Sequence, residues 1–338
     1  MKKTIAFIVL GLLGVGLFTS MILSSNIHSL WDSLHHISIP ALIVFTTISI
    51  INFLVFTVKW DVILRTNNNN IPPIHELALF RLVTFALSYL IPSAQVGGEP
   101  ARIYLLEQKG VKRNVAVSSV VIDKVFELSI NVLFSVGALA VLFLHRSTFE
   151  NTGVFFIALA IIVLVFFFYQ TVKGNGFFTS IFDGLRLNRI HFFAQYRHTI
   201  SNTEKTMKTF FHHHLLALFT TIILSIICFL LMILEYFVIF YFLDVTPTFS
   251  QLLIVTVVPL MGYLIPVPGA VGTLEMAQIT AFTLAGLDPI LALPTVIILR
   301  VRDIIFVLGG LLYTYKKGFS LVMSGGVSKN KKVNKNAP

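Results

Sequence analysis

Long apolar runs determine what this chain can fold into. Eight stretches of mostly apolar residues approach or exceed the about 20 residues that a helix needs to cross the hydrocarbon core of a membrane. They cover residues 4–23, 40–58, 74–91, 116–144, 152–170, 215–243, 249–265 and 289–315. The runs lack the alternating pattern of a membrane β-barrel. We therefore predict an all-α polytopic membrane protein with about eight transmembrane helices.

The composition excludes several other classes of protein. Hydrophobic residues make up 56% of the chain and charged residues only 12%, about half the charged fraction of a soluble domain. The net charge of +10 lies in the links between and after the runs, so we expect no nucleic-acid partner. The single cysteine, Cys228, excludes a disulfide framework. Adjacent histidines at 212–214 would point in different directions on a helix, and we expect no metal site and no cofactor.

Basic residues also predict the topology, because cytoplasmic loops carry an excess of Lys and Arg. Lys2 and Lys3, the link with Lys59 and Arg65, the stretch 173–212 and the tail after residue 315 are all basic. We expect these parts, and both termini, on the inner side of the cytoplasmic membrane. The first run could also be a signal peptide, but its length favours an uncleaved helix.

The same counting divides the chain into parts. We predict one integral membrane domain over residues 1–324 and a basic, disordered tail over residues 325–338. The stretch 173–212 is rich in Phe as well as in basic residues, which favours helices lying in the headgroup layer. Two links on the inner side must be separated by an even number of crossings. The long runs between them are odd in number, so extra re-entrant or half-helix elements are required at residues 92–110 and 266–287.

An internal repeat supports these two extra elements. The tetrapeptide Tyr-Leu-Ile-Pro at residues 89–92 recurs at residues 263–266, and each copy leads through glycines to a glutamate, Glu99 or Glu275. On the predicted topology the two copies run in opposite directions. This predicts an inverted repeat, with halves at about residues 40–172 and 213–316, as in many secondary transporters.

Ionisable groups inside the runs are the main candidates for a site. Each costs about 2.5–3.5 kcal/mol at the centre of a bilayer on insertion scales, so we expect them to meet inside the helix bundle. The candidate substrate-binding residues are Glu99, Arg102, Asp123, Lys124, Glu127, Glu275, Arg300, Arg302 and Asp303. Arg81 and Glu235 are further charges of this kind. Two interpretations remain open, namely ion pairs that only join helices and a path for a substrate or an ion.

Two loops beside these charges read as helix breaks followed by new helices. Their turn-forming residues are Pro92, Gly97 and Gly98 in the first loop, and Pro266, Pro268, Gly269 and Gly272 in the second. A new helix would offer free backbone amides to an anion such as a lipid phosphate. Glu99 opposes an anion at the first loop unless it caps the new helix or pairs with Arg102. We predict that the two re-entrant loops mark the binding site.

The residues around both loops resemble a known family. Gly97-Gly98-Glu99-Pro100-Ala101-Arg102, with Asp123, Lys124 and Glu127 downstream, resembles the membrane region of the lysylphosphatidylglycerol synthase family. The second half is similar to the family's other signature, in Pro266-x-Pro268-Gly269-x-x-Gly272-x-x-Glu275 and Arg300-x-Arg302-Asp303. It departs from the family in Ala270 and Val271, where members often carry glycine-rich sequence. The resemblance covers almost the whole chain and implies a flippase-like membrane domain.

The resemblance also implies a function. We expect translocation of a phospholipid, such as aminoacylated phosphatidylglycerol, or of a related lipid across the cytoplasmic membrane. The expected partner is this anionic or aminoacylated lipid, with a separate lipid-synthesising enzyme as a second candidate. Only a Lys-rich tail follows Tyr315, so we do not expect the phosphatidylglycerol lysyltransferase activity of full-length members. A lipid-modifying membrane enzyme and a non-transporting partner subunit remain as alternatives.

Overall fold

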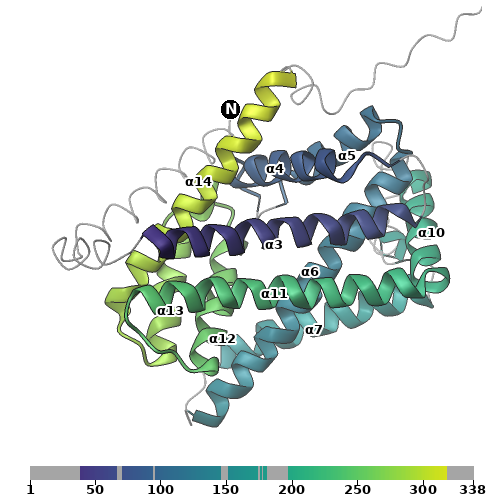
Figure 1. Ribbon diagram of the computed structural model, residues 1–338. Helices are drawn as coiled ribbons and strands as arrows, with labels where there is room; N and C mark the ends of the chain where they lie inside the picture. Colours follow the sequence, from purple (N-terminus) through teal and green to yellow (C-terminus); the bar gives the residue numbers. More distant parts are fainter. Residues whose placement is uncertain are drawn as a thin grey trace, which may run out of the picture.

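The computed structural model describes residues 39–66, 71–93, 96–145, 151–173, 176, 178–180 and 197–317. Throughout these ranges the secondary structure is helical and no strand occurs (Figure 1). The first half contains α3 (Ile39–Arg65), α4 (Ile74–Leu90), α5 (Glu99–Gln108), α6 (Arg113–His145) and α7 (Asn151–Val172). The second half contains α10 (Arg197–His213), α11 (Leu215–Phe242), α12 (Phe249–Val257), η2 (Val258–Leu264), η3 (Pro268–Ala270), α13 (Thr273–Ala285), η4 (Pro289–Leu291) and α14 (Ala292–Lys317).

The prediction of an all-α membrane protein is confirmed for this part of the chain. Every predicted run falls on helix except 4–23, which lies outside the described residues. Three helices are long and apolar enough to cross a membrane, over Leu42–Arg65, Arg113–Leu142 and Leu215–Phe242. Apolar side chains such as Leu216 and Leu133 are exposed on them, as expected for a bundle surrounded by lipid. The count of about eight crossings stays a prediction, as does the basic tail, which is outside the described part.

The predicted placement of Lys59 in a cytoplasmic link is wrong. The α3 helix continues to Arg65, and the Lys59 side chain is fully buried within the bundle. The reason is electrostatic, because Asp123 of α6 lies 3.0 Å from its ammonium group and compensates a charge that would otherwise exclude Lys59 from the apolar interior.

A short helical hairpin forms where the sequence predicts the first half-helix element. The α4 and α5 helices lie side by side and antiparallel. The Lys109 ammonium at the end of α5 lies 2.6 Å from Glu76 at the start of α4. The Ser88 hydroxyl accepts a hydrogen bond from the Gly98 amide in the connecting loop. A Cβ atom on Gly98 would lie 1.9 Å from the carbonyl oxygen of Thr84. Only glycine therefore permits this close approach of α5 to α4.

A second hairpin forms from α12, η2 and α13. The side-chain amide of Gln251, near the start of α12, donates to the carbonyl oxygen of Ala285 at the end of α13, at 3.2 Å. The loop between η2 and α13 turns at Gly269 and Gly272, which have φ angles of 60° and 84°. These left-handed conformations favour glycine. The predicted half-helix at 266–287 is thus a helix, α13, that returns toward the start of α12.

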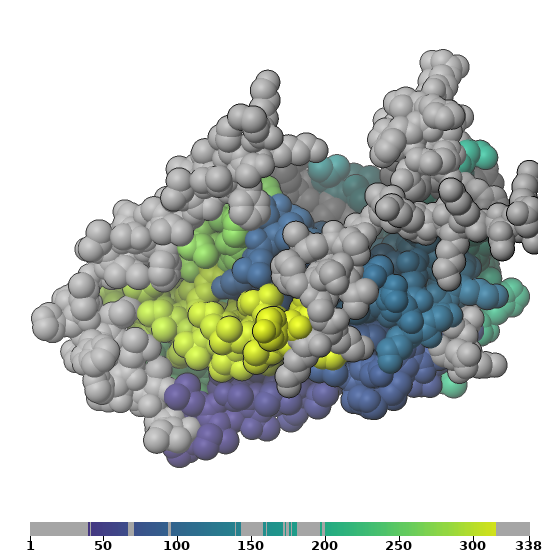
Figure 2. Space-filling model, turned by 90° about the horizontal axis from the view of Figure 1, so that it is seen from above, coloured from purple at the N-terminus to yellow at the C-terminus, as the bar shows by residue number. Residues whose placement is uncertain are grey.

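The two hairpins meet through α14. This helix packs along α4, and its Gly310 contacts the backbone of Leu82 closely. Figure 2 shows α14 in yellow beside α3 in purple on one face. The Phe53 ring of α3 and the Phe306 ring of α14 lie 5.4 Å apart. At the end of α4, the Tyr89 hydroxyl reaches Arg300 of α14. The tips of the hairpins therefore lie next to each other inside the bundle.

The predicted headgroup-layer helix corresponds in part to α10. Figure 1 shows α10 at the end of the bundle where α3 ends and α11 begins. Its Met207 and Phe210 are buried in a cluster with Phe126 and Phe167, whereas its Lys205 is exposed. Residues 181–196 of the predicted stretch lie outside the described part. An amphipathic helix at a bundle end fits an interfacial position.

Candidate functional site

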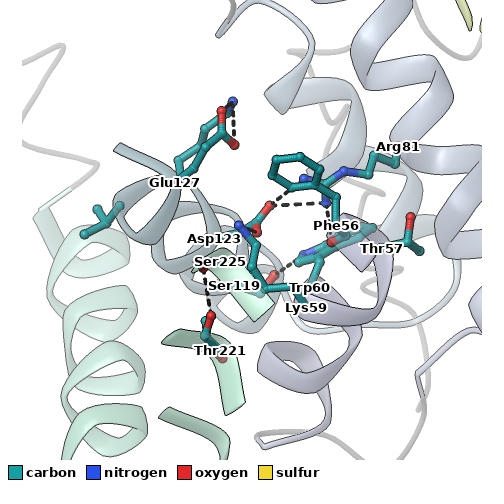
Figure 3. Close-up of polar contacts among 12 residues, drawn as sticks. Phe56, Thr57, Lys59, Trp60, Arg81, Ser119, Asp123, Glu127, Thr221 and Ser225 are labelled. Carbon is teal, nitrogen blue, oxygen red and sulfur yellow. Dashed lines mark hydrogen bonds and ion pairs between the residues drawn. The ribbon is translucent and has the colours of Figure 1, made fainter. Parts of the chain in front are cut away.

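A buried carboxylate joins the helices of the first half. Asp123 of α6 is fully buried, and it binds Lys59 of α3 at 3.0 Å, Arg102 of α5 at 2.9 Å and Arg81 of α4 at 3.3 Å. Figure 3 shows Arg81 and Lys59 converging on Asp123 beside Phe56. Since three cations share this one carboxylate, Asp123 holds the first hairpin against α3 and α6.

The cluster around Asp123 continues toward α5. Glu99 lies 2.9 Å from Arg102 and 3.6 Å from Lys124, and Lys124 lies 2.9 Å from Glu127. We call these seven residues the first cluster; its members are Lys59, Arg81, Arg102, Lys124, Glu99, Asp123 and Glu127. Four cations meet three carboxylates here, so the first cluster carries one positive charge in excess.

Aromatic rings cover three of these cations, and the Lys59 ammonium lies 5.0 Å from the centre of the Phe56 ring. The Arg102 guanidinium lies 4.4 Å from the centre of the Trp60 ring, and that of Arg81 lies 4.9 Å from the Phe56 ring. A cation over an aromatic face gains about 0.5–2 kcal/mol, with the larger values in dry surroundings. The rings thus help to hold the guanidinium groups in place within an apolar bundle.

In the second half, a buried arginine takes the central position. Arg300 of α14 donates from Nε and Nη2 to Glu275 of α13, at 3.0 and 2.8 Å. It also donates to the carbonyl oxygens of Gly269 and Ala270 and, at 2.9 Å, to the Tyr89 hydroxyl. The other oxygen of Glu275 accepts the Gly272 amide and caps α13. Arg300 and Glu275 therefore fix the loop that precedes α13.

Next to Arg300, a second arginine, Arg302, lies between two carboxylates. Arg302 donates from Nη1 to Glu235 of α11 and from Nη2, at 2.9 Å, to Asp303 of its own helix. Glu235 and Asp303 are both nearly fully buried. Ser49 and Asn52 of α3 face Glu235. We call Glu235, Arg302 and Asp303 the second cluster, in which one cation meets two carboxylates.

A cavity of about 300 Å³ lies between the two clusters. Its size is at the lower end of the about 300–1,000 Å³ typical of small-molecule sites. Its walls come from α3, α4, α5, α6, α11, α12, η2 and α14, and from the loops that follow α4 and η2. Charged groups of both signs and aromatic rings line it together, so it offers a polar chamber inside an apolar bundle.

Most of the predicted site residues lie on this cavity. Six of the nine line it, namely Glu99, Arg102, Lys124, Glu127, Arg302 and Asp303. Asp123, Glu275 and Arg300 do not line it. Asp123 and Arg300 bind residues that do, namely Arg102 and Gly269, and Glu275 binds Arg300. Of the predicted loop residues only Gly269 lines the cavity, whereas Pro92, Gly97, Gly98, Pro266, Pro268 and Gly272 do not. The structure thus brings the predicted charges together and leaves their role as substrate ligands a prediction.

Several cavity residues were missed or not assigned to a site from the sequence. Arg81 and Glu235 stood out as charges in apolar runs, but their partners could not be identified. Ser49 and Asn52 give no signal, because small polar residues are common in membrane helices. Tyr89 and Tyr263 both line the cavity and are the first residues of the repeated tetrapeptide. That repeat was the signal that could have identified them.

The structure also shows whether the described residues could hold a metal ion. Among the residues that the structure describes, no group of three His, Cys, Asp or Glu side chains could hold a metal ion. His212 and His213 are exposed on α10. The carboxylates of both clusters have arginine or lysine partners instead.

Fold and site together define a polytopic α-helical membrane protein with a charged internal cavity. The family model described as the lysylphosphatidylglycerol synthase TM region matches residues 7–309 of the 338. The chain therefore belongs to this family, and the predicted resemblance is confirmed. Neither the comparison with curated proteins nor that with solved structures returned a match. Membership in the family agrees with a membrane location and a role connected with membrane lipids.

Proposed function

We propose that this protein moves a phospholipid, such as aminoacylated phosphatidylglycerol or a related lipid, between the leaflets of the cytoplasmic membrane. The observation that carries the proposal is the cavity of about 300 Å³ lined by both charged clusters. A headgroup must lose its water to cross the hydrocarbon, and fixed charges around a cavity can replace that water. The lipid tails would remain outside, against the apolar surface of the bundle.

The arrangement of the hairpins supports alternating access. The open end of the first hairpin, at Glu76 and Lys109, lies at the end of the bundle where α3 and α14 finish. Tyr313 near the end of α14 packs there against the buried cluster that contains Trp60, Leu64 and Leu77. The open end of the second, at Gln251 and Ala285, lies near the opposite end, where α11 finishes. The hairpins thus enter from opposite sides and meet at the cavity. We take this as the predicted inverted repeat, with the basic end of α3 and the end of α14 on the cytoplasmic side.

The charge of the first cluster indicates which part of the lipid it binds. One of its positive charges has no carboxylate of its own among the described residues. An uncompensated buried charge is costly unless a partner arrives. A lipid phosphate would supply that partner, and Arg81 and Lys124 are the partly exposed cations on the cavity wall that would meet it.

Lipid flipping in proteoliposomes tests this function. The dye should sit on an acyl chain, because a cavity of about 300 Å³ leaves little room for it beside a headgroup. Vesicles with wild-type protein should equilibrate labelled phosphatidylglycerol or its lysyl ester between leaflets faster than empty vesicles. The Arg81→Gln variant should flip the lipid about tenfold more slowly, as expected for the loss of about 1.4 kcal/mol of binding in the transition state.

The matched control is Arg65→Gln, which removes an exposed arginine at the end of the same bundle and away from the cavity. Equal flipping in wild type, empty vesicles and both variants would contradict the proposal for these lipids. The only cysteine, Cys228, lines the cavity and gives a second readout. Lipid in the cavity should slow its reaction with a small thiol reagent, whether or not the lipid is moved.

A further inference from the structure

The second cluster has one negative charge too many for its surroundings. Glu235 and Asp303 are about 2% exposed, and both bind the single guanidinium of Arg302. Arg300, which lies on the same helix as Arg302, is occupied by Glu275 and two carbonyl oxygens. An isolated charge in an apolar interior costs several kcal/mol. Both carboxylates of this pair are therefore not expected to be ionised together.

Among the described residues, the Ser49 and Asn52 side chains opposite Glu235 each carry a buried oxygen atom that no donor reaches. Ser49 and Asn52 of α3 face Glu235 and are 2% and 8% exposed. The Ser49 hydroxyl oxygen and the Asn52 carbonyl oxygen are buried and have no hydrogen-bond partner. An ionised carboxylate cannot help the Asn52 oxygen, because both are acceptors. A protonated Glu235 carboxyl group would offer an O–H donor to the Asn52 oxygen.

We propose that the Glu235–Asp303 pair binds one exchangeable proton, held on Glu235, as a proton site in the cavity wall. Glu235 is the better carrier because Arg302 gives Asp303 two hydrogen bonds, from Nε and Nη2, and gives Glu235 only one. The other groups near the pair include Ser49 and Asn52 of α3, Tyr89 of α4, Tyr236 of α11 and Tyr263 of η2. None of these is a cation that could replace the proton.

The geometry favours a proton over a metal cation. The guanidinium of Arg302 occupies the space between the two carboxylates, and its charge would repel a second cation there. A proton needs only one oxygen and an acceptor. Its release would leave one negative charge facing the cavity, opposite the positive excess of the first cluster. The cavity could then alternate between binding a proton and binding a cationic group of a headgroup; this coupling rests on the proposed function, whereas the proton site does not.

Infrared difference spectroscopy of the purified protein in lipid tests the proton site directly. A pH titration of wild type should show a protonated carboxyl band that shifts in heavy water. The band should be absent from Glu235→Gln. It should also disappear in Asp303→Asn, where Glu235 remains but the charges balance, so that the result does not depend on one variant folding. The control is Glu127→Gln, which lies on the same cavity but whose carboxylate is paired with Lys124 at 2.9 Å; it should keep the band.

A band that persists in both Glu235→Gln and Asp303→Asn, or one that is lost only with Glu127→Gln, would overturn the proton site. The coupling is tested in proteoliposomes with an imposed pH difference. Wild type should shift labelled lipid toward one leaflet, and in Glu235→Gln the pH difference should no longer bias the distribution of the lipid, whatever the flipping rate of this variant. Flipping that ignores the pH difference in wild type would contradict the coupling alone. No flipping at all would contradict the proposed function, while the infrared result would still decide the proton site.

Discussion

The two hairpins follow the same plan with opposite charges. In the first, the base Arg102 on the short helix α5 meets the acid Asp123 on the long helix α6, at 2.9 Å. In the second, the acid Glu275 on the short helix α13 meets the base Arg300 on the long helix α14, at 2.8 Å. The central residue is an acceptor in one case and a donor in the other, and this decides what each hairpin can bind.

An ionised carboxylate in the central position has no hydrogen to donate, so it binds only hydrogen-bond donors. The donors around Asp123 are cationic side chains from three helices. A central guanidinium has five N–H groups and can use carbonyl oxygens. Arg300 accordingly binds the backbone at Gly269 and Ala270. The comparison teaches that the first site organises side chains around the cavity, whereas the second fixes a loop at its edge.

The largest effect should come from removing the central acid. Asp123→Asn leaves Lys59 and Arg102 buried without their shared carboxylate. Loss of one partner from a buried ion pair costs about 3–5 kcal/mol. Thermal unfolding in detergent, followed by the fluorescence of Trp60 beneath Arg102, should show a large loss of stability. The control Asp61→Asn breaks a more exposed pair with Arg65 and should cost only about 0–1 kcal/mol. Equal shifts in the two variants would contradict a central role for Asp123.

The second hairpin should respond locally rather than globally. Arg300→Lys keeps the charge near Glu275 but loses the fork that also reaches Ala270 and Tyr89. We expect a loss of about 1.5–3 kcal/mol, the range for hydrogen bonds to charged groups. Hydrogen exchange should rise in the loop 265–272 and stay unchanged in the loop 91–98. A rise of equal size in both loops would show that the two hairpins do not differ in the way described.

How far the sequence predicted these regions depends on the type of contact. The runs, the two short return helices and most of the charged residues followed from hydrophobic length and from the cost of buried charge. The ion-pair partners of these residues could not be predicted, because a pair such as Arg302 with Glu235 joins helices that are distant in the chain. Lys59 was misplaced because the positive-inside rule counts a lysine near a helix end as cytoplasmic, and only the position of Asp123 shows that it is buried.

The close contact between the first hairpin and α14 could not be predicted from the sequence either. Gly309 and Gly310 are adjacent on α14, and the sequence alone does not distinguish their roles. In the structure, a Cβ atom on Gly310 would lie 2.4 Å from the Leu82 carbonyl oxygen, whereas one on Gly309 would meet only a Leu82 methyl group at 3.8 Å. A periodicity argument places both on α14 and cannot tell which one faces the backbone of α4.

This pair gives a test of the contact that brings the two hairpins together. Gly310→Ala should force α4 and α14 apart and cost about 1–3 kcal/mol, as for other overpacked sites. Gly309→Ala meets an ordinary contact and should be neutral or stabilising by up to about 1 kcal/mol, because alanine favours helix. Thermal unfolding of the two variants side by side measures the difference. Similar stabilities would mean that the α4–α14 contact is not close at Gly310.

The smallest effect should come from the one side-chain hydrogen bond between Arg300 and α4. The Tyr89 hydroxyl, at the end of α4, accepts from Arg300 at 2.9 Å, and its ring packs on Gly269. Tyr89→Phe keeps the ring and removes only this acceptor, so we expect a loss of about 0.5–1.5 kcal/mol in thermal unfolding. In a double-mutant cycle with Arg300→Lys the two losses should not add, because both remove the same bond.

The control is Tyr263→Phe, at the matching position of the repeated tetrapeptide. Its hydroxyl makes no hydrogen bond to Arg300 within the described part of the chain, so its removal should change stability less and leave the effect of Arg300→Lys unaltered. Additive losses for Tyr89 with Arg300 would mean that the hairpins are held together by α4–α14 packing alone. Non-additive losses for Tyr89 and additive ones for Tyr263 would instead show that the repeat has become asymmetric, with one tyrosine joining the hairpins and the other left to face the cavity.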